Sequence, residues 1–378
     1  FFISLVVDQK TNNDPTDNFG IRPLPNLEAK FVAANTLIGL QKRESELFDS
    51  VAIKAKENDL KIAKHKIFSA KTVKTKRKYR QMVSDLRLEI ANMLKENGVI
   101  GNNEARQLAS WDMFDQNTSS PFFDPEWMFG VINGFDVVIG NPPYGAKLSK
   151  EDKALYRKLY PESQFKIDTY SLFILRSMNL LFKNGVCSYI LPNTLLDNYF
   201  EELVRIKLLK SFILSEINDL NDKVFEGAVV HAMIISFLNK QSNDYNVKVN
   251  SKENLYDEPE YIPASYFLKQ PNCMISIRTY ENQDLLDKLS NGCKPLEEVL
   301  DIRQAIKSGD DKLYMSNTKK NSNYKPILRG ADIGKYFFRF SGSYINYGKH
   351  LACPRNHEIF EQPKILIREA GATITATY

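Results

Sequence analysis

Long apolar segments are missing from this sequence of 378 residues. Runs such as Phe135 to Gly140 fall far short of the roughly 20 residues that a transmembrane helix needs. Phe1 to Val7 is apolar, but it has neither a basic leader nor a small-residue cleavage site, so we expect no signal peptide. The sequence therefore predicts a cytoplasmic protein without a membrane partner.

Clustered cysteines and histidines are missing as well. The four cysteines are widely spaced and include no CxxC pair: Cys187, Cys273, Cys293 and Cys353. The four histidines form no pair at a metal-ligand spacing: His65, His231, His350 and His357. Reduced, mostly buried thiols fit this pattern better than disulfides or zinc do. We therefore expect a chemistry that needs no metal.

Acidic residues are absent from one stretch, although the net charge of the whole chain is only +5. Between Lys61 and Arg80 there are nine basic residues and no Asp or Glu: Lys61, Lys64, Lys66, Lys71, Lys74, Lys76, Arg77, Lys78 and Arg80. A solvated helix face explains many such runs. Contact with a polyanion explains others, because Lys and Arg release counterions from phosphates. Both interpretations stay open at this point.

Proline and glycine are absent from Gln41 to Asn97, where helix-forming residues dominate. We expect two long helices here, ending near Asn97-Gly98. The apolar run from Phe135 to Gly140 then predicts a short strand that is buried on both faces of the sheet. A helix is expected over 168–183 with a stop at Asn184-Gly185, followed by a strand over 186–191, a helix over 195–209 and strands over 211–218 and 229–238. This alternation predicts an α/β fold with a doubly wound, Rossmann-like sheet.

The last part of the chain has a different character. From about residue 291 onward, short apolar runs alternate with Gly- and Asn-rich turns, as in 325–330, 343–346 and 364–368. This pattern predicts a second, mainly β module.

One tetrapeptide, Asn141-Pro142-Pro143-Tyr144, directly follows the first predicted strand. At background usage, a given tetrapeptide occurs by chance in only about a few chains per thousand of this length. In open α/β sheets, ligands bind at the carboxyl ends of strands. Two prolines fix two φ angles and remove two N–H donors, so this loop is stiff and its carbonyls can face a ligand.

A planar exocyclic amine is a weak nucleophile toward a methyl donor, because its lone pair is delocalised into the ring. The Asn141 side-chain oxygen and the Pro142 carbonyl could accept hydrogen bonds from the two N–H groups of this amine. Tyr144 could stack on the ring. Base stacking of this kind is worth roughly 1–3 kcal/mol. The motif therefore predicts methyl transfer to a planar nitrogen.

Phe135 to Tyr144 resembles the catalytic motif of the gamma-class adenine-N6 DNA methyltransferases, especially the fused restriction–modification enzymes of type IIG. The resemblance covers roughly residues 1–240. It implies S-adenosylmethionine as cofactor, with Asn35 and Asn141 near it, and a flipped-out adenine from double-stranded DNA held between Tyr144 and Phe225. It also implies a target-recognition module, similar to 327–333 and 363–378, and allows for a nuclease outside this sequence.

The resemblance also implies a Gly-rich cofactor loop, which we expect in a part that precedes Phe1. With the composition shifts, it divides the chain into a remnant of the cofactor-binding half (1–40), a helical insertion (41–110), the catalytic half (111–245), a linker with a helix (246–290) and the start of the target-recognition domain (291–378).

Two other functions remain open. The same motif suits methylation of a protein glutamine or an RNA base. A DNA-binding specificity protein with an inactive catalytic fold is the alternative from another class. The recognised sequence is not readable from one chain, because it depends on which side chains reach the base edges.

Overall fold

The computed structural model describes residues 7, 9–21, 30–40, 51–70, 72–115, 117–163, 166–220, 231–251, 258–277, 280, 282–369, 371 and 373–378. The chain divides into two compact units, Phe1–Gln283 and Asp284–Tyr378, which are described separately.

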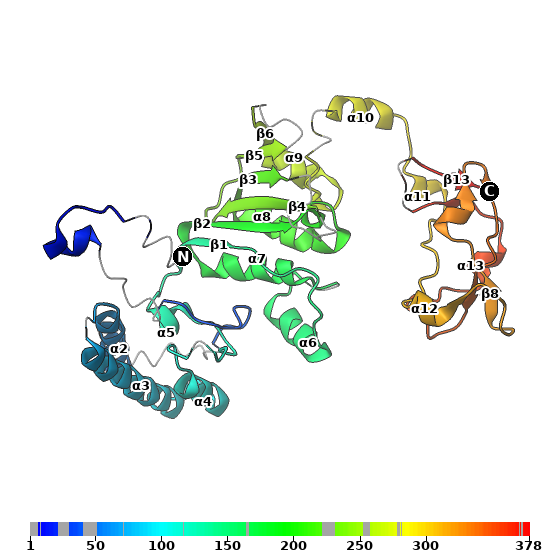
Figure 1. Cartoon of the computed structure of the whole chain (residues 1–378). Coiled ribbons are helices and arrows are strands. Elements are labelled where there is room, and N and C mark those ends of the chain that lie inside the picture. The colour runs from blue at the N-terminus through cyan, green and yellow to red at the C-terminus, as the bar shows by residue number, and fades with distance from the viewer. Residues whose placement is uncertain are drawn as a thin grey trace. The chain divides into compact units, whose positions relative to one another are not determined.

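The first unit contains a six-stranded sheet (Figure 1). Its strands are β1 (Phe135–Gly140), β2 (Leu181–Pro192), β3 (Ile213–Asp219), β4 (Ala232–Leu238), β5 (Asn246–Ser251) and β6 (Glu260–Pro263). They follow the order β1-β2-β4-β3-β5-β6. The pairs β1–β2 and β3–β5 are parallel and the other three are antiparallel, so the sheet is mixed. The predicted α/β fold is confirmed.

Helices α7 (Thr169–Leu180) and α8 (Glu202–Ser211) pack against this sheet. Leu172, Leu175 and Met178 of α7 are buried in its core, as their helical spacing predicts. The smaller elements of this unit are η1 (Pro15–Gly20), α6 (Lys150–Leu159), η3 (Asn193–Leu195), η4 (Tyr199–Glu201), α9 (Ala264–Lys269) and η6 (Pro271–Cys273).

Strand β1 differs from its prediction in burial. Val137 is 63% exposed and Ile139 is 79% exposed, although both faces were expected to be covered. In the part of the chain that the structure describes, β1 is the edge strand and pairs only with β2. The apolar run therefore identified a strand correctly but gave the wrong burial.

The predicted helix stop at Asn184-Gly185 is also wrong. Helix α7 ends at Leu180, because Leu181 already pairs with Phe135 as the first residue of β2. Asn184, with φ of 64°, and Gly185 instead lie within β2, where the register with β1 shifts. A Cβ on Gly185 would lie 2.7 Å from the Phe135 carbonyl oxygen, so this close approach of two backbones requires glycine.

The segment 246–290, expected to be a linker with a helix, begins instead with two sheet strands, β5 and β6. The alternating apolar residues of β5, Val247 and Val249, are buried in the sheet core. The expected helix is present as α10 (Gln283–Ser290).

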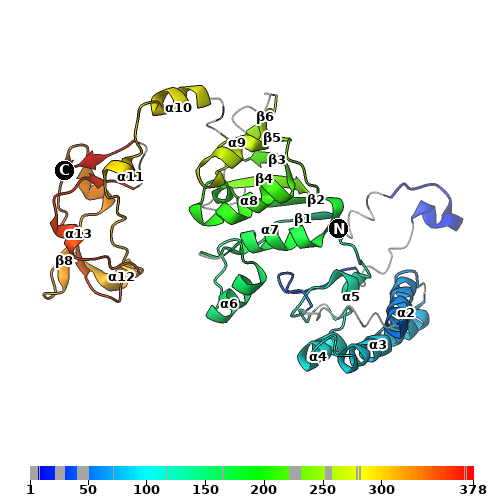
Figure 2. The same cartoon turned by 180° about the vertical axis from the view of Figure 1, so that it is seen from behind.

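The helical insertion forms a hairpin of two long helices (Figure 2). They are α2 (Val51–Phe68) and α3 (Val73–Glu96), and α3 ends at its C-cap Asn97 as predicted. Thr72 caps the start of α3 by accepting a hydrogen bond from Thr75 N. Two shorter helices, α4 (Asn102–Ser110) and α5 (Pro125–Phe129), complete a separate hydrophobic core with the hairpin.

The second unit contains small antiparallel sheets, in agreement with the predicted mainly β module. Its strands are β7 (Met315–Ser316), β8 (Tyr324–Pro326), β9 (Ile333–Gly334), β10 (Phe337–Phe338), β11 (Tyr344–Asn346), β12 (Leu366–Ile367) and β13 (Ala376–Thr377). They pair as β7-β11-β8, β10-β9 and β12-β13. Its short helices are α11 (Leu296–Val299), α12 (Asp311–Tyr314), η7 (Gly330–Asp332) and α13 (Glu358–Glu361).

All four cysteines are free thiols. Among the described residues, no three His, Cys, Asp or Glu side chains gather where they could hold a metal ion. No described helix combines the length and the apolar character that a membrane span needs.

Candidate active site

The Asn-Pro-Pro-Tyr loop leaves the carboxyl end of β1 at the edge of the sheet. Asn141 is exposed and Pro142 is buried. Tyr144 is half-buried and packs against the core of the sheet. The loop thus presents its amide side chain to solvent on an anchored backbone.

Two side chains at the start of α7 form hydrogen bonds with the backbone of this loop. The Thr169 hydroxyl donates a hydrogen bond to the Pro143 carbonyl oxygen at 2.6 Å. The Asp168 carboxylate accepts one from Gly145 N at 3.0 Å. Asp168 is the N-cap residue of α7, yet its side chain makes no hydrogen bond to the helix, so its carboxylate serves the loop instead. We call this pair the loop clamp.

The loop clamp leaves two acceptors of interest on the loop, Asn141 Oδ1 and Pro142 O. The Tyr144 hydroxyl donates to Asn141 Oδ1 at 3.3 Å, and a carbonyl oxygen has a second lone pair. The Pro143 carbonyl is taken by Thr169. Within the described residues, no hydrogen bond reaches the Pro142 carbonyl. The exposed Asn141 Oδ1 therefore has room for a further hydrogen bond, and the carbonyl of the buried Pro142 has no partner among the described residues.

A buried carboxyl group lies behind the loop clamp. Glu201 is 2% exposed and accepts hydrogen bonds from Ser171 Oγ at 2.6 Å and from the Tyr170 hydroxyl at 3.4 Å. Burial raises the pKa of Glu201. These bonds join the first turn of α7 to the 3-10 turn η4.

Asn35, the other residue expected near the cofactor, closes a local turn. Its side-chain oxygen accepts a hydrogen bond from Leu37 N at 3.2 Å, and its own N–H donates to Ser120 O. The segment is anchored to α7, because Arg176 donates to Thr36 O at 2.8 Å. In the described residues no hydrogen bond joins Asn35 to Asn141. The cofactor role of Asn35 therefore stays a prediction.

Phe225, the predicted second stacking residue, lies outside the described residues, so its role also stays a prediction. Sequence reasoning missed Asp168, Thr169 and Glu201. The only signal for Asp168 and Thr169 was their position at the start of a predicted helix, which is an ordinary helix-start pattern, and Glu201 had no signal.

The chemistry of the loop fits a sulfonium methyl donor. Residues 141–146 carry no cationic side chain and present neutral amide and carbonyl oxygens beside an aromatic ring. Such oxygens carry partial negative charge and attract a positively charged sulfonium group. Asn141 is the exposed residue of this loop that could face it.

The mixed sheet and the loop after β1 define an α/β protein with exposed hydrogen-bond acceptors at one edge of its sheet. Residues 43–225 match the family model of the Eco57I restriction-modification methylases. Residues 325–378 match the model of the TaqI-like C-terminal specificity domain. The chain therefore contains an Eco57I-like restriction–modification methylase domain followed by a TaqI-like specificity domain. The methylase match supports S-adenosylmethionine as the cofactor.

Several curated proteins are similar to parts of this chain. A Methanocaldococcus jannaschii protein assigned as a type II restriction enzyme and methyltransferase is 30% identical over 258 residues, covering 64% of this chain and 21% of its own length. The type II methyltransferase M.TthHB8I of Thermus thermophilus is 30% identical over 112 residues, or 24% of each protein. The type II restriction enzyme and methyltransferase RM.Eco57I of Escherichia coli is 39% identical over 64 residues, covering 16% of this chain and 6% of its own length. The chain thus spans less than a quarter of each of these relatives.

Among solved structures, the type IIL restriction-modification enzyme MmeI in complex with DNA matches 78% of this chain and 48% of its own, with 13% identity and a TM-score of 0.35. A protein of Listeria monocytogenes, titled as a class I S-adenosylmethionine-dependent methyltransferase, matches 46% of this chain and 57% of its own, with 16% identity and a TM-score of 0.28.

Proposed function

We propose that this chain is the modification part of a restriction–modification enzyme and methylates the N6 amine of adenine in double-stranded DNA. The observation that carries the proposal is the proline-stiffened loop Asn141–Tyr144, held by the loop clamp with two acceptors available. S-adenosylmethionine, when bound, supplies an activated methyl group on a sulfonium centre.

The two N–H groups of the amine donate hydrogen bonds to Asn141 Oδ1 and Pro142 O of the loop. These bonds favour a more tetrahedral nitrogen, whose lone pair is then available for attack. The loop clamp holds the backbone that follows both acceptors before the substrate arrives, and correct positioning of reacting groups can lower a barrier by about 7–11 kcal/mol. No strong general base is required if the nitrogen loses its proton after attack.

The substrate base has to leave the DNA duplex to reach this loop. The amine of a stacked adenine is inaccessible, so the nucleotide must be extruded into the site. Tyr144, whose ring is held against the core, would stack on the extruded base. Phe225 is proposed as the ring on its other face.

Incubation of the full protein with labelled S-adenosylmethionine and either duplex DNA, RNA or a protein extract tests the substrate class. We expect label in duplex DNA alone. Label in a protein band or in RNA, with none in DNA, would show that the loop serves another planar nitrogen. Sequence-specific DNA binding without any transfer would identify an inactive specificity protein.

Removal of the Thr169 hydroxyl tests the loop clamp. Thr169→Val keeps the shape of the side chain but leaves the Pro143 carbonyl without its donor. We expect the single-turnover methylation rate to fall about 10- to 100-fold, because small displacements of catalytic groups are costly. The KM for DNA should change little.

The matched control is Thr169→Ser, which keeps the hydroxyl and should restore a rate close to that of the parent protein. Equal rates for the valine and serine variants would show that this hydrogen bond does not position the loop.

A further inference from the structure

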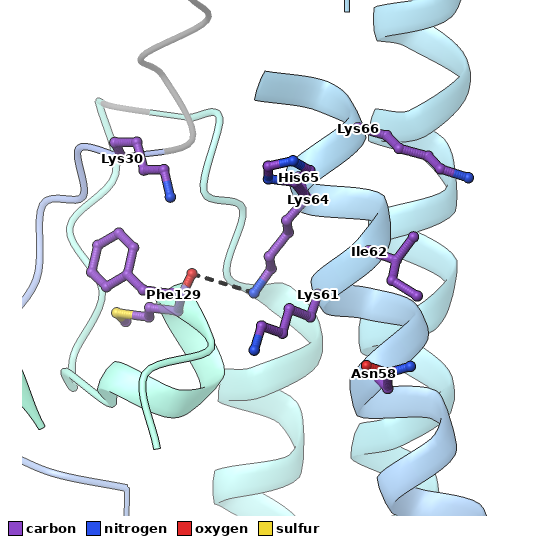
Figure 3. Close-up of a pocket in the computed structure, with 9 residues that line it drawn as sticks. Lys30, Asn58, Lys61, Ile62, Lys64, His65, Lys66 and Phe129 are labelled. Atoms are coloured by element: carbon purple, nitrogen blue, oxygen red, sulfur yellow. Dashed lines mark hydrogen bonds between the residues drawn. The ribbon is translucent and has the colours of Figure 1, made fainter. Parts of the chain in front are cut away.

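A second site lies away from the acceptor loop, in the helical insertion. A cavity of about 370 Å³ opens between α2 and the end of α5 (Figure 3). It is lined by Lys30, Asn58, Lys61, Ile62, Lys64, His65, Lys66, Met128 and Phe129. Figure 3 shows Lys30, Lys61 and Lys64 pointing toward the same space, whereas Lys66 extends to the other side of α2. The described lining therefore includes three converging lysine side chains and no carboxylate.

Among the described residues, no carboxylate lines this cavity, and Asp124 is the acidic residue that acts on Lys64. Lys64 is half-buried, and among the described residues its ammonium donates to two backbone carbonyls, those of Trp127 and Met128. Burial, together with repulsion from Arg87 and Lys30, lowers the pKa of Lys64 to about 7, and Asp124 opposes this shift. A bound anion would stabilise the charged form of Lys64.

Arg87 on the adjacent helix α3 adds to the positive charge near this cavity. Its side chain is 4% exposed, and Asp112 approaches it only to 3.9 Å. Its Nε and Nη1 atoms have no hydrogen-bond partner in the structure. Two buried or half-buried cations in one small region carry an electrostatic cost that a bound anion would reduce.

Further basic residues follow the cavity lysines along the chain. Eight of the nine Lys and Arg residues in 61–80 lie in the last turns of α2 and the first turns of α3, and the ninth, Lys71, lies outside the described residues. Ten helical residues extend about 15 Å, and duplex DNA carries one negative charge per about 1.7 Å of its axis. The basic end of the hairpin therefore matches several successive phosphates in extent and charge.

We propose that this cavity binds a backbone phosphate of duplex DNA, and that the basic end of the α2–α3 hairpin follows the DNA backbone beside it. The proposal rests on the proposed function for the identity of the polyanion. A contact of this kind adds affinity and orientation without reading sequence.

The test removes the two exposed cavity lysines together, as Lys30→Gln and Lys61→Gln in one variant. Affinity for a mixed-sequence DNA duplex is measured by fluorescence anisotropy at about 50 to 200 mM salt. We expect the magnitude of the salt slope, log K against log salt, to fall by about 0.9 for each lost phosphate contact. At about 100 mM salt the affinity should fall at least tenfold.

The control variant carries Lys95→Gln and Lys240→Gln, which remove the same charge at two exposed positions outside the cavity. It should retain the slope and nearly all the affinity of the parent protein. Equal slopes for the two double variants would overturn the proposal.

Methylation at saturating DNA separates this proposal from the proposed function. The cavity variant should keep the maximal rate of the parent protein, because its lysines do not touch the acceptor loop. Suppose that neither the parent protein nor the cavity variant transfers methyl groups, but that the salt slope of the cavity variant is still smaller. The proposed function then fails and the phosphate site stands.

Discussion

Replacing Asn141 by alanine is expected to lower the methylation rate about 100- to 1000-fold, the range found when one preorganised hydrogen-bonding group is removed from a catalytic site. The substitution deletes one of the two acceptors that the loop offers to the substrate amine. Because Asn141 is exposed, the variant should fold normally. Single-turnover transfer from labelled cofactor to DNA measures the rate, and anisotropy measures DNA affinity, which should change only a few-fold.

Tyr144→Phe is the matched comparison for this variant. It removes the hydrogen bond from the Tyr144 hydroxyl to Asn141 Oδ1 but keeps the ring. Its rate should fall much less than that of Asn141→Ala, because the acceptor and the stacking surface both remain. A near-normal rate for Asn141→Ala would mean that the amide oxygen takes no part in the reaction.

Replacing Arg205 by methionine is expected to destabilise the first unit by about 3–5 kcal/mol, the cost of removing a charged donor from a buried network. Arg205 is fully buried in α8. Its guanidinium donates to four backbone carbonyls, those of Leu195, Asn198, Asn272 and Cys273, at 2.7 to 3.1 Å. Methionine fills similar space but leaves all four without this donor.

Urea unfolding measures this loss through the transition midpoint. Lys210→Met on the same helix is the control, because Lys210 is exposed and the substitution removes the same charge. We expect a change of about 0.5 kcal/mol or less for the control. Similar midpoints for the two variants would show that the arginine network contributes little to stability.

The elements that could be predicted from sequence are those set by local patterns. The absence of proline and glycine in 41–97 correctly predicted α2 and α3, and the position of the Asn-Pro-Pro-Tyr loop after a strand was also correct. Burial of β1 was predicted wrongly, since an apolar run gives no information on whether a strand lies at the edge of a sheet. Asn184-Gly185 has the composition of a helix stop, but pairing with Phe135 places it inside a strand.

The support of the candidate site was not readable from the sequence, because it depends on contacts between distant segments. Asp168 and Thr169 meet the loop across 23 and 26 residues of chain. Glu201 reaches Ser171 across 30 residues. An Asp or Thr at the start of a helix usually caps that helix, so local pattern alone favours the wrong partner.

The identity of the methylated nucleoside tests the central claim most directly. Duplex DNA incubated with the full protein and S-adenosylmethionine is digested to nucleosides and analysed by mass spectrometry. We predict N6-methyldeoxyadenosine from the parent protein and almost none from Asn141→Ala. Methylated deoxycytidine, or N6-methyldeoxyadenosine at equal levels from both proteins, would contradict the assignment of the loop as the adenine-amine site.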